Sequence, residues 1–210
     1  MENELIKSKN RVAQFGEVFT PENIVNDMLD LVKDESYRVD SKFLEPSCGN
    51  GNFLVKILER KLETASKLDM QVYARYVFVS VTSIYAIDIM KDNIRQAKDR
   101  LLEVIRREYS IKMGTVVPER LLRSLKFILD TNIIWGDSIA GIRQANGQGI
   151  VIAEWKLAGD TVYRKDYSFI SLCSRLGCVV EQEYEPINFN EVYNIKKKKS
   201  SDKLLEEFGF

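Results

Sequence analysis

The sequence predicts an α/β fold, with a mostly parallel sheet flanked by helices, in a chain of 210 residues. Three observations predict it. Short apolar segments alternate with segments of helical periodicity along the chain. Two glycines one residue apart join the first of these strands to the helix that follows it. Carboxylates stand at the ends of three successive strands. Because ligands of such sheets bind beyond the carboxyl ends of the strands, we expect a binding site there.

The composition suits a single domain with a sizeable core, since 45% of the residues are apolar. We expect one domain over residues 15–190. It would follow a flexible N-terminal segment, residues 1–14, and precede a polar tail, residues 191–210. The tail carries the lysine run Lys196–Lys199, which fits either a solvated end or an arm that contacts phosphate.

Charge and residue counts exclude several function classes. The 31 basic and 31 acidic residues cancel, so no overall field attracts nucleic acid or a membrane surface. No segment is long and apolar enough to span a membrane, and the polar N-terminus is no signal peptide. Three cysteines fit a reduced, cytoplasmic protein. The absence of histidine excludes histidine-dependent catalysis and histidine metal ligands, and we expect no metal site.

The elements follow from local patterns. The first helix begins at Thr20-Pro21, read as an N-cap followed by proline at the first helical position, and Ile24, Val25, Met28, Leu29 and Val32 form its apolar face. Strands are expected at 42–44, 84–88, 132–135 and 150–153, and helices at 53–67, from 91 and from 118. Residues 70–83 fit a strand or a helix equally well. Beyond residue 155 the pattern weakens to a strand at 161–163, a helix or turn at 169–176 and a late strand at 178–180.

The segment Leu44–Leu54 organises the expected site. Gly49 and Gly51 lack Cβ atoms, so the backbone can turn with positive φ and approach a ligand closely. The free N–H groups of the helix that starts here would point at that ligand. A lone Gly-x-Gly is a weak signal, and most such pairs are plain turns.

The acids at the strand ends strengthen the prediction. Glu45, Asp88 and Asp137 end three successive strands. An acid after the second strand can accept hydrogen bonds from both hydroxyls of a ribose. An acid after the third can accept from an amino group such as that of adenine. Each of these acids taken singly is as easily a solvated loop residue.

The loop favours a ligand that contains adenosine but no phosphate. A dinucleotide fingerprint requires a third glycine at the position of Leu54, and a phosphate-binding P-loop requires Lys and Ser or Thr after Gly51, where Asn52-Phe53 stand. S-adenosylmethionine fits this description. Its carboxylate would suit the positive end of a helix, and the helix that starts at Thr20-Pro21 is one candidate.

Four motifs in this order resemble the adenine-specific DNA methyltransferases of restriction–modification systems, over about residues 15–138. The motifs are Phe15–Pro21, Leu44–Leu54, Tyr85–Ile89 and Ile134–Ser138. The resemblance implies a Rossmann-like methyltransferase fold that uses S-adenosylmethionine as cofactor. It implies these cofactor-binding residues: Phe19, Thr20, Pro21, Glu45, Pro46, Gly49, Gly51, Asp88, Ile89 and Asp137.

The chain departs from that family at the catalytic motif. In the family the fourth strand ends in Asn/Asp-Pro-Pro-Tyr/Phe, which holds the target amine and stacks on the flipped base. Here the four prolines are never adjacent, and Glu154-Trp155 occupy the slot after Ile150–Ala153. Glu154 could accept from an amine and Trp155 could stack on a base, so these two are the candidate catalytic residues. A charged glutamate without the diproline is nevertheless a different acceptor.

Three functions therefore remain open. The first is a DNA adenine methyltransferase with an unusual fourth motif, or one whose DNA contacts come from a specificity or catalytic partner chain. The second is a cofactor-binding subunit or degenerate methyltransferase without catalysis of its own. The third is methylation of RNA, protein or a small molecule on the same fold. We expect the first as the family and impaired or partner-dependent catalysis as the behaviour.

Overall fold

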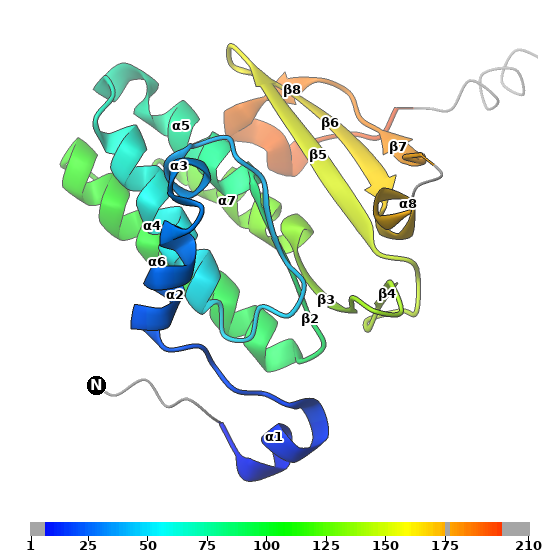
Figure 1. Cartoon of the computed structure of the whole chain (residues 1–210). Coiled ribbons are helices and arrows are strands. Elements are labelled where there is room, and N and C mark those ends of the chain that lie inside the picture. The colour runs from blue at the N-terminus through cyan, green and yellow to red at the C-terminus, as the bar shows by residue number, and fades with distance from the viewer. Residues whose placement is uncertain (1–6, 175–176, 199–210) are drawn as a thin grey trace, which may run out of the picture.

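The computed structural model describes residues 7–174 and 177–198, and within these the chain is a mixed α/β protein (Figure 1). The helices are α1 (Lys9–Phe15), α2 (Glu22–Asp30), α3 (Lys33–Tyr37), α4 (Asn52–Ser66), α5 (Met70–Thr82), α6 (Lys91–Met113), α7 (Glu119–Asn132), α8 (Phe169–Cys173) and the 3₁₀ helix η1 (Phe189–Asn194). The strands are β1 (Phe43–Glu45), β2 (Ile84–Asp88), β3 (Ile133–Asp137), β4 (Ile142–Arg143), β5 (Val151–Ala158), β6 (Thr161–Ser168), β7 (Val180–Glu183) and β8 (Ile187–Asn188).

The strands form two sheets. The first sheet has the order β1-β2-β3-β4, in which β1–β2 and β2–β3 are parallel and β3–β4 is antiparallel. The second sheet has the order β5-β6-β7, with β8 also on β6, and all its pairs are antiparallel. The prediction of parallel strands with intervening helices is therefore confirmed only for β1 to β3.

The strand expected at 150–153 does not continue the parallel sheet. It belongs to β5, which pairs with β6 from Val151↔Ser168 to Ala158↔Thr161 across the two-residue turn Gly159-Asp160. Gly159 has a φ of +60°, which glycine adopts without strain, so the turn favours a hairpin. Thr161–Tyr163, expected as a separate short strand, is the return strand of this hairpin.

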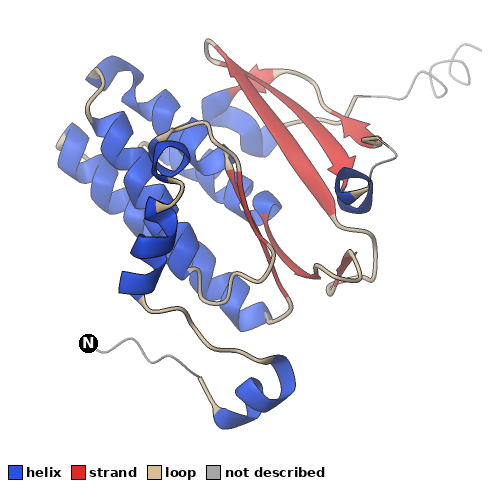
Figure 2. Ribbon diagram, viewed as in Figure 1, coloured by secondary structure: helices blue, strands red, loops and turns tan. Residues whose placement is uncertain are grey.

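The first sheet lies between most of the helices on one side and the second sheet on the other (Figure 2). Tyr85 of β2 joins the two sheets, since its hydroxyl donates a hydrogen bond to the carbonyl oxygen of Ala153 at 2.8 Å. Burial raises the pKa of this phenol, which keeps it a donor. Core side chains from α4, α5, α6 and α7 are almost fully excluded from solvent, among them Leu58, Phe78, Leu101 and Leu125.

Residues 70–82 are helical, which settles the open choice between strand and helix for the segment 70–83. Asp69 caps α5 by accepting from the backbone N–H of Gln71 at 2.8 Å, and Tyr73, Val77 and Val81 are buried along one face. Such a cap with buried residues at intervals of four fits a helix better than a strand.

The start of α2 differs from the prediction. Pro21 rather than Thr20 is the cap residue, and the helix begins at Glu22 without a side-chain cap. Val25 and Leu29 are buried, but Ile24, Met28 and Val32 are 41%, 49% and 46% exposed. The apolar face is therefore narrower than the sequence pattern indicates.

The predicted domain limits fall inside structural elements. The limit at residue 14 lies within α1, and the limit at residue 190 lies within η1, whose Val192 is fully buried. Of the lysine run, Lys196, Lys197 and Lys198 lie beside the end of β7, where the backbone of Lys198 donates to Glu183. Residues 1–6 and 199–210, with Lys199, lie outside the described residues. Within the described part of the chain, every helix is too short or too polar to cross a bilayer.

Lys61 of α4 is completely buried and predicts a dependence of stability on pH. Its ammonium donates to the carbonyls of Arg38, Val39 and Ser41 and to the Ser83 hydroxyl. Burial lowers the pKa of Lys61 to about 7. Above pH 7 the unfolded chain therefore binds a proton that the folded chain has released, and folding is favoured as the pH rises.

We expect the free energy of unfolding to rise by about 1–2 kcal/mol between pH 7 and 8.5, measured by urea denaturation. Lys61→Met removes the titrating group and should give a flat profile at lower overall stability, because the carbonyls lose their donor. An equal slope in Lys61→Met would contradict this assignment.

Candidate functional site at the carboxyl ends of β1, β2 and β3

The carboxyl ends of β1, β2 and β3 meet at one edge of the first sheet, because these strands are parallel. The register pairs Glu45 with Ala86 and Asp88 with Trp135, so each strand ends two residues beyond the strand before it. Glu45, Asp88 and Asp137 thus end at a common edge. Burial raises the pKa of Glu45, the acid that ends β1.

The glycine loop is tied directly to the acid of β2. Gly49 and Gly51 have φ values of +53° and +87°, in the region that favours glycine. The backbone N–H of Gly49 donates to Asp88 Oδ2 at 2.8 Å, and that of Cys48 donates to the carbonyl of Ile87 at 3.1 Å. The loop therefore bends over the end of β2 before α4 begins at Asn52.

Asp88 is nearly buried, with 6% of its surface exposed. Its second oxygen, Oδ1, accepts from the backbone N–H of Met90 at 2.8 Å and from Asn93 Nδ2 at 3.3 Å. Three donors hold the carboxylate in one orientation. A carboxylate offers about four acceptor positions, so capacity remains for a ligand hydroxyl.

The segment Phe19–Pro21 packs on the glycine loop. Phe19 is 7% exposed, and a Cβ on Gly49 would come within 3.0 Å of its ring. Asn52, the first residue of α4, donates through Nδ2 to the carbonyl of Thr20 at 2.8 Å. Two sequence motifs separated by about thirty residues therefore form one wall of the site.

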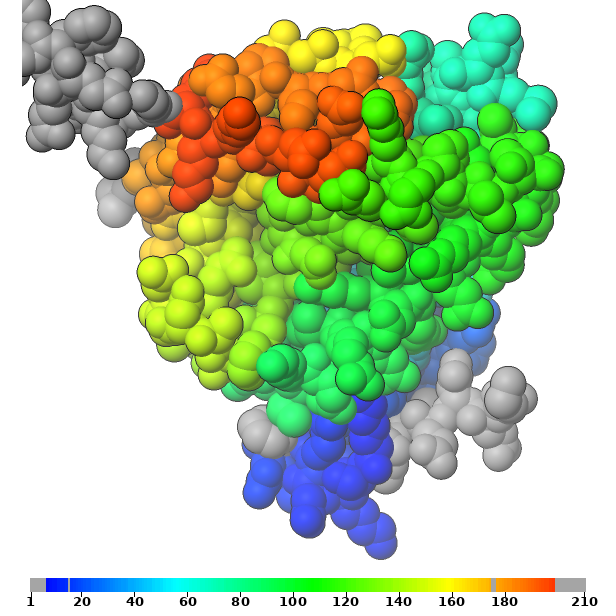
Figure 3. All heavy atoms as spheres, turned by 180° about the vertical axis from the view of Figure 1, so that it is seen from behind, coloured from blue at the N-terminus to red at the C-terminus, as the bar shows by residue number. Residues whose placement is uncertain are grey.

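An ionic network connects α1 to Asp88. Arg11 pairs with Asp92 and with Glu17, each at 2.6 Å. Asn93 donates to Glu17 Oε1 at 2.6 Å through the same amide nitrogen that contacts Asp88. The hydrogen bond from Arg11 holds the pKa of Asp92 well below its usual range. Seen from behind, the residues of α1 lie against those at the start of α6 (Figure 3).

The third strand contributes Asp137 and Trp135. Asp137 Oδ1 accepts from the backbone N–H groups of Ile139 and Ala140, both at 2.9 Å, and so holds the turn after β3. The indole N–H of Trp135 donates to the carbonyl of Ile89 at 2.9 Å. Ile89 itself is 40% exposed, which leaves its side chain available to pack on an apolar ring.

The edge fits S-adenosylmethionine by the chemistry of its groups. The oxygen Oδ1 of Asn50, in the middle of the loop, is buried and lacks a hydrogen-bond partner among the described residues. Arg100 holds the loop from behind, donating to the carbonyl of Asn50 and to Asn52 Oδ1, both at 2.8 Å. An unsatisfied acceptor, two glycines and three acids suit a ligand that brings ammonium, hydroxyl and amino donors.

The candidate catalytic residues lie elsewhere. Glu154 and Trp155 sit inside β5, so the expected position at a strand end is wrong. Trp155 is 8% exposed, donates to Asn132 Oδ1 at 3.0 Å, and meets the Phe127 ring edge-on. A buried indole is not available to stack on a base.

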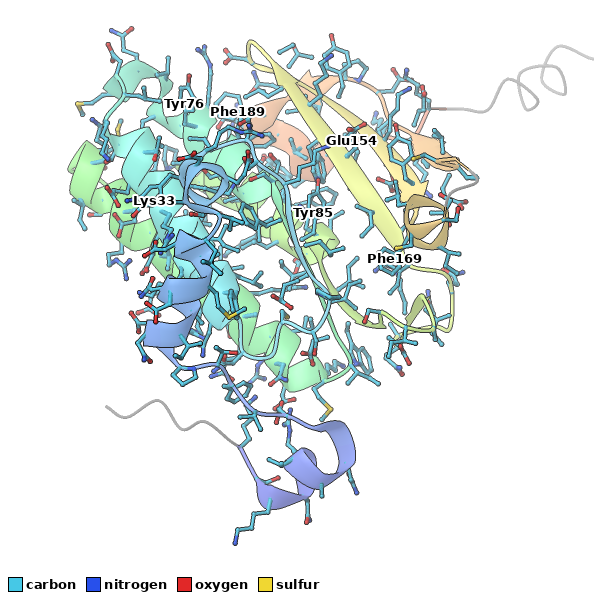
Figure 4. The ribbon with its side chains drawn as sticks, in the orientation of Figure 1. Lys33, Tyr76, Tyr85, Glu154, Phe169 and Phe189 are labelled. Atoms are coloured by element: carbon cyan, nitrogen blue, oxygen red, sulfur yellow. The ribbon has the colours of Figure 1, made fainter. Side chains whose placement is uncertain are left out.

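Glu154 lies near the start of β1, away from the sheet edge that carries Glu45, Asp88 and Asp137. Its carboxylate pairs with Lys42 at 2.9 Å, which lowers its pKa, and accepts from the Tyr167 hydroxyl at 3.3 Å. Lys42 precedes β1, three residues and about 10 Å of extended chain before Glu45. Figure 4 shows Glu154 on β5, and it shows Tyr85 and then Phe169 at successively lower positions in the view. The structure therefore brings the cofactor candidates together without the catalytic ones.

Sequence analysis missed Glu17, Asn50, Asn93, Arg100 and Trp135. Their contacts join residues as far as 86 positions apart. The only available signal was proximity, since Glu17 lies in the N-terminal motif, Asn50 in the loop, and Asn93 five residues after Asp88. Within the described residues, no group of three or more His, Cys, Asp or Glu side chains could hold a metal ion.

Gly51 allows a direct test of the loop. A Cβ there would lie 2.9 Å from Ala97 Cβ, on top of the cost of its positive φ. We expect Gly51→Ala to lower the free energy of unfolding by about 2–3 kcal/mol, from left-handed backbone strain and overpacking. Gly159→Ala is the matched control, because Gly159 has a φ of +60° and open space around it. Thermal or urea unfolding should show a smaller loss there, and equal losses would disprove the close approach to Ala97.

The fold is that of a mixed α/β protein, and it is consistent with a methyltransferase fold. One family comparison matches part of the chain. Residues 5–103 match the model of a family described as N-6 DNA methylase, which confirms the resemblance to adenine-specific DNA methyltransferases for this part of the chain. The matched range contains the N-terminal motif, the glycine loop and Asp88, and it ends before Asp137 and Glu154. No curated protein and no solved structure matches the chain.

Proposed function

We propose that the chain is the cofactor-binding part of a DNA adenine methyltransferase of the restriction–modification type, and that methyl transfer depends on a partner chain. The observation that carries the proposal is the contact of the Gly49 amide with Asp88 under the Phe19–Pro21 segment. This contact joins motifs that lie within the N-6 DNA methylase match, and a Rossmann-like site would need them together at one edge of the sheet.

Different residues of this edge bind different parts of the cofactor. Asp88 accepts from the ribose hydroxyls, and Asp137 accepts from the adenine amino group. Ile89 packs on the adenine ring. Glu45 with Pro46 and the Phe19–Pro21 segment surround the methionine end. When bound, S-adenosylmethionine supplies an activated methyl group on its sulfonium.

Catalysis by the chain alone is not supported by its residues. Transfer to an amine requires an acceptor that holds the amine in line with the methyl group, and positioning of this kind contributes roughly 7–11 kcal/mol. The chain has no adjacent prolines, Trp155 is buried, and Glu154 faces away from the cofactor edge. A partner that brings the missing segment, and DNA contacts with it, would complete a cytoplasmic enzyme.

Two measurements on the purified full-length chain test this function. Titration calorimetry should show binding of S-adenosylmethionine, and absence of binding would disprove the cofactor assignment. Incubation with labelled S-adenosylmethionine and DNA should leave the adenines unmethylated. Methylation that is lost in Glu154→Ala would disprove partner dependence and restore Glu154 as a catalytic residue.

A further inference from the structure

We infer that the outer edge of β1 binds an extended, apolar segment of a second protein chain, which adds a strand to the first sheet. The inference extends the proposed function, since it places the partner. It rests on the free edge of β1, on the groove beside that edge, and on the uncharged character of this groove.

β1 is the end strand of its sheet among the described residues. The backbone N–H of Phe43 donates to Ser83, and Phe43 and Glu45 face β2 in the parallel register. Because alternate residues of a strand direct their N–H and C=O groups to opposite sides, those of Leu44 point away from β2. An edge that offers one donor and one acceptor in this way is a template for another strand.

A groove of about 490 Å³ runs along this edge. One wall is Phe43 and Leu44 of β1 with Tyr85 of β2, and the other comes from β5, β6 and α8. Leu44 is 47% exposed and Leu172 of α8 is 41% exposed, so each wall presents a large apolar side chain. A cavity of this volume accommodates several side chains of a peptide.

The charges identify the class of occupant. Among the described residues that line the groove, the charged side chains are Lys42 and Glu154, which form an ion pair at 2.9 Å. These described lining residues therefore offer no net charge to the phosphates of DNA. An apolar chain in extended conformation can pack its side chains against the walls and form hydrogen bonds with the outward N–H and C=O groups of Leu44.

The groove also leads to the cofactor edge. It follows β1 from Lys42 toward Glu45, the strand end where the candidate cofactor residues gather. A strand placed along β1 would end beside that site. The described C-terminal residues, up to Lys198, lie beside the end of β7, and β6 separates β7 from β5 (Figure 1), which favours a second chain as the occupant.

Photo-crosslinking in cells of the source organism tests this site. A benzophenone amino acid replaces Leu172 in the full chain, and mass spectrometry maps the peptide to which it is joined. We expect one extended apolar segment of a different protein. Leu44→Val, which retains the N–H, should retain the product. Leu44→Pro, which removes that outward N–H and the leucine side chain, should reduce it at least tenfold.

Controls separate the alternatives. Leu44→Lys is a second variant in case proline disturbs β1, and circular dichroism verifies folding of each variant. A probe at Ile111, which is 72% exposed on α6, reports nonspecific labelling. Products with residues 199–210, with a second copy of this chain, or no stronger than those at Ile111 would each overturn the inference. Calorimetry with S-adenosylmethionine distinguishes such a failure from failure of the proposed function.

Discussion

Asp88→Ala is expected to weaken binding of S-adenosylmethionine by about 100-fold to 10,000-fold. Two hydrogen bonds from ribose hydroxyls to a carboxylate would be lost, each contributing about 1.5–3 kcal/mol. The substitution also removes the acceptor for the Gly49 and Met90 amides, so the glycine loop loses its attachment to β2. Titration calorimetry on the purified variant measures the change directly.

The matched control is Asp99→Ala. Asp99 is an exposed acid on α6, the helix that follows Asp88, so its removal changes the net charge equally and leaves the edge intact. Asp88→Asn is a second variant of nearly equal size in case the alanine variant unfolds, which thermal unfolding would reveal. Wild-type affinity in a folded Asp88 variant would contradict the role of this carboxylate.

The part of the site that is formed by residues close together in the sequence was predictable. A strand, two glycines and a helix follow one another within Leu44–Leu54, and the conformations that they require follow from the residue types. Strand-end acids were predictable too, because parallel strands place their carboxyl ends at one edge. The N-6 DNA methylase match over residues 5–103 covers most of these features.

The contacts that hold the site in place were not predictable in this way. Asn93 donates to Glu17 and Asp88, and Lys7 donates to Asn93 at 2.6 Å across 86 positions. Hydrogen bonds between distant side chains depend on the packed geometry and have no periodicity in the sequence. In the sequence, Asn93 therefore looks like any other polar residue of α6, although its side chain supports Asp88.

The prediction for the C-terminal part of the chain was wrong for a different reason. A short apolar run such as Ile150–Ala153 fits a parallel strand and an antiparallel one equally well. The Gly159-Asp160 turn decides in favour of a hairpin, and its return strand carries polar residues at inward positions. Once β5 pairs with β6, Glu154 and Trp155 point to opposite faces of a strand, and a common catalytic site for both is lost.

Asp166→Ala is expected to lower the free energy of unfolding by about 3–5 kcal/mol, because it leaves the buried charge of Arg164 without its partner. Arg164 and Asp166 are 8% and 7% exposed and form two hydrogen bonds, at 2.7 and 2.9 Å. The Tyr184 hydroxyl donates to the same carboxylate at 2.9 Å. The guanidinium lies 4.8 Å from the Trp155 ring centre, so the pair helps to anchor β5 and β6 on α7.

Two controls distinguish the cost of leaving a buried charge unpaired from the smaller cost of losing an exposed ion pair. Lys165→Ala removes an exposed ion pair with Glu183 from the other face of the same strand, and we expect stability close to that of the wild type. The double variant with Arg164→Met and Asp166→Leu removes both charges and should recover much of the stability lost in Asp166→Ala. Urea denaturation of the wild type and the three variants measures the free energy of unfolding of each. An equal loss in Lys165→Ala and Asp166→Ala would show that the inward face of β6 is not buried, and the placement of the second sheet against α7 would fail with it.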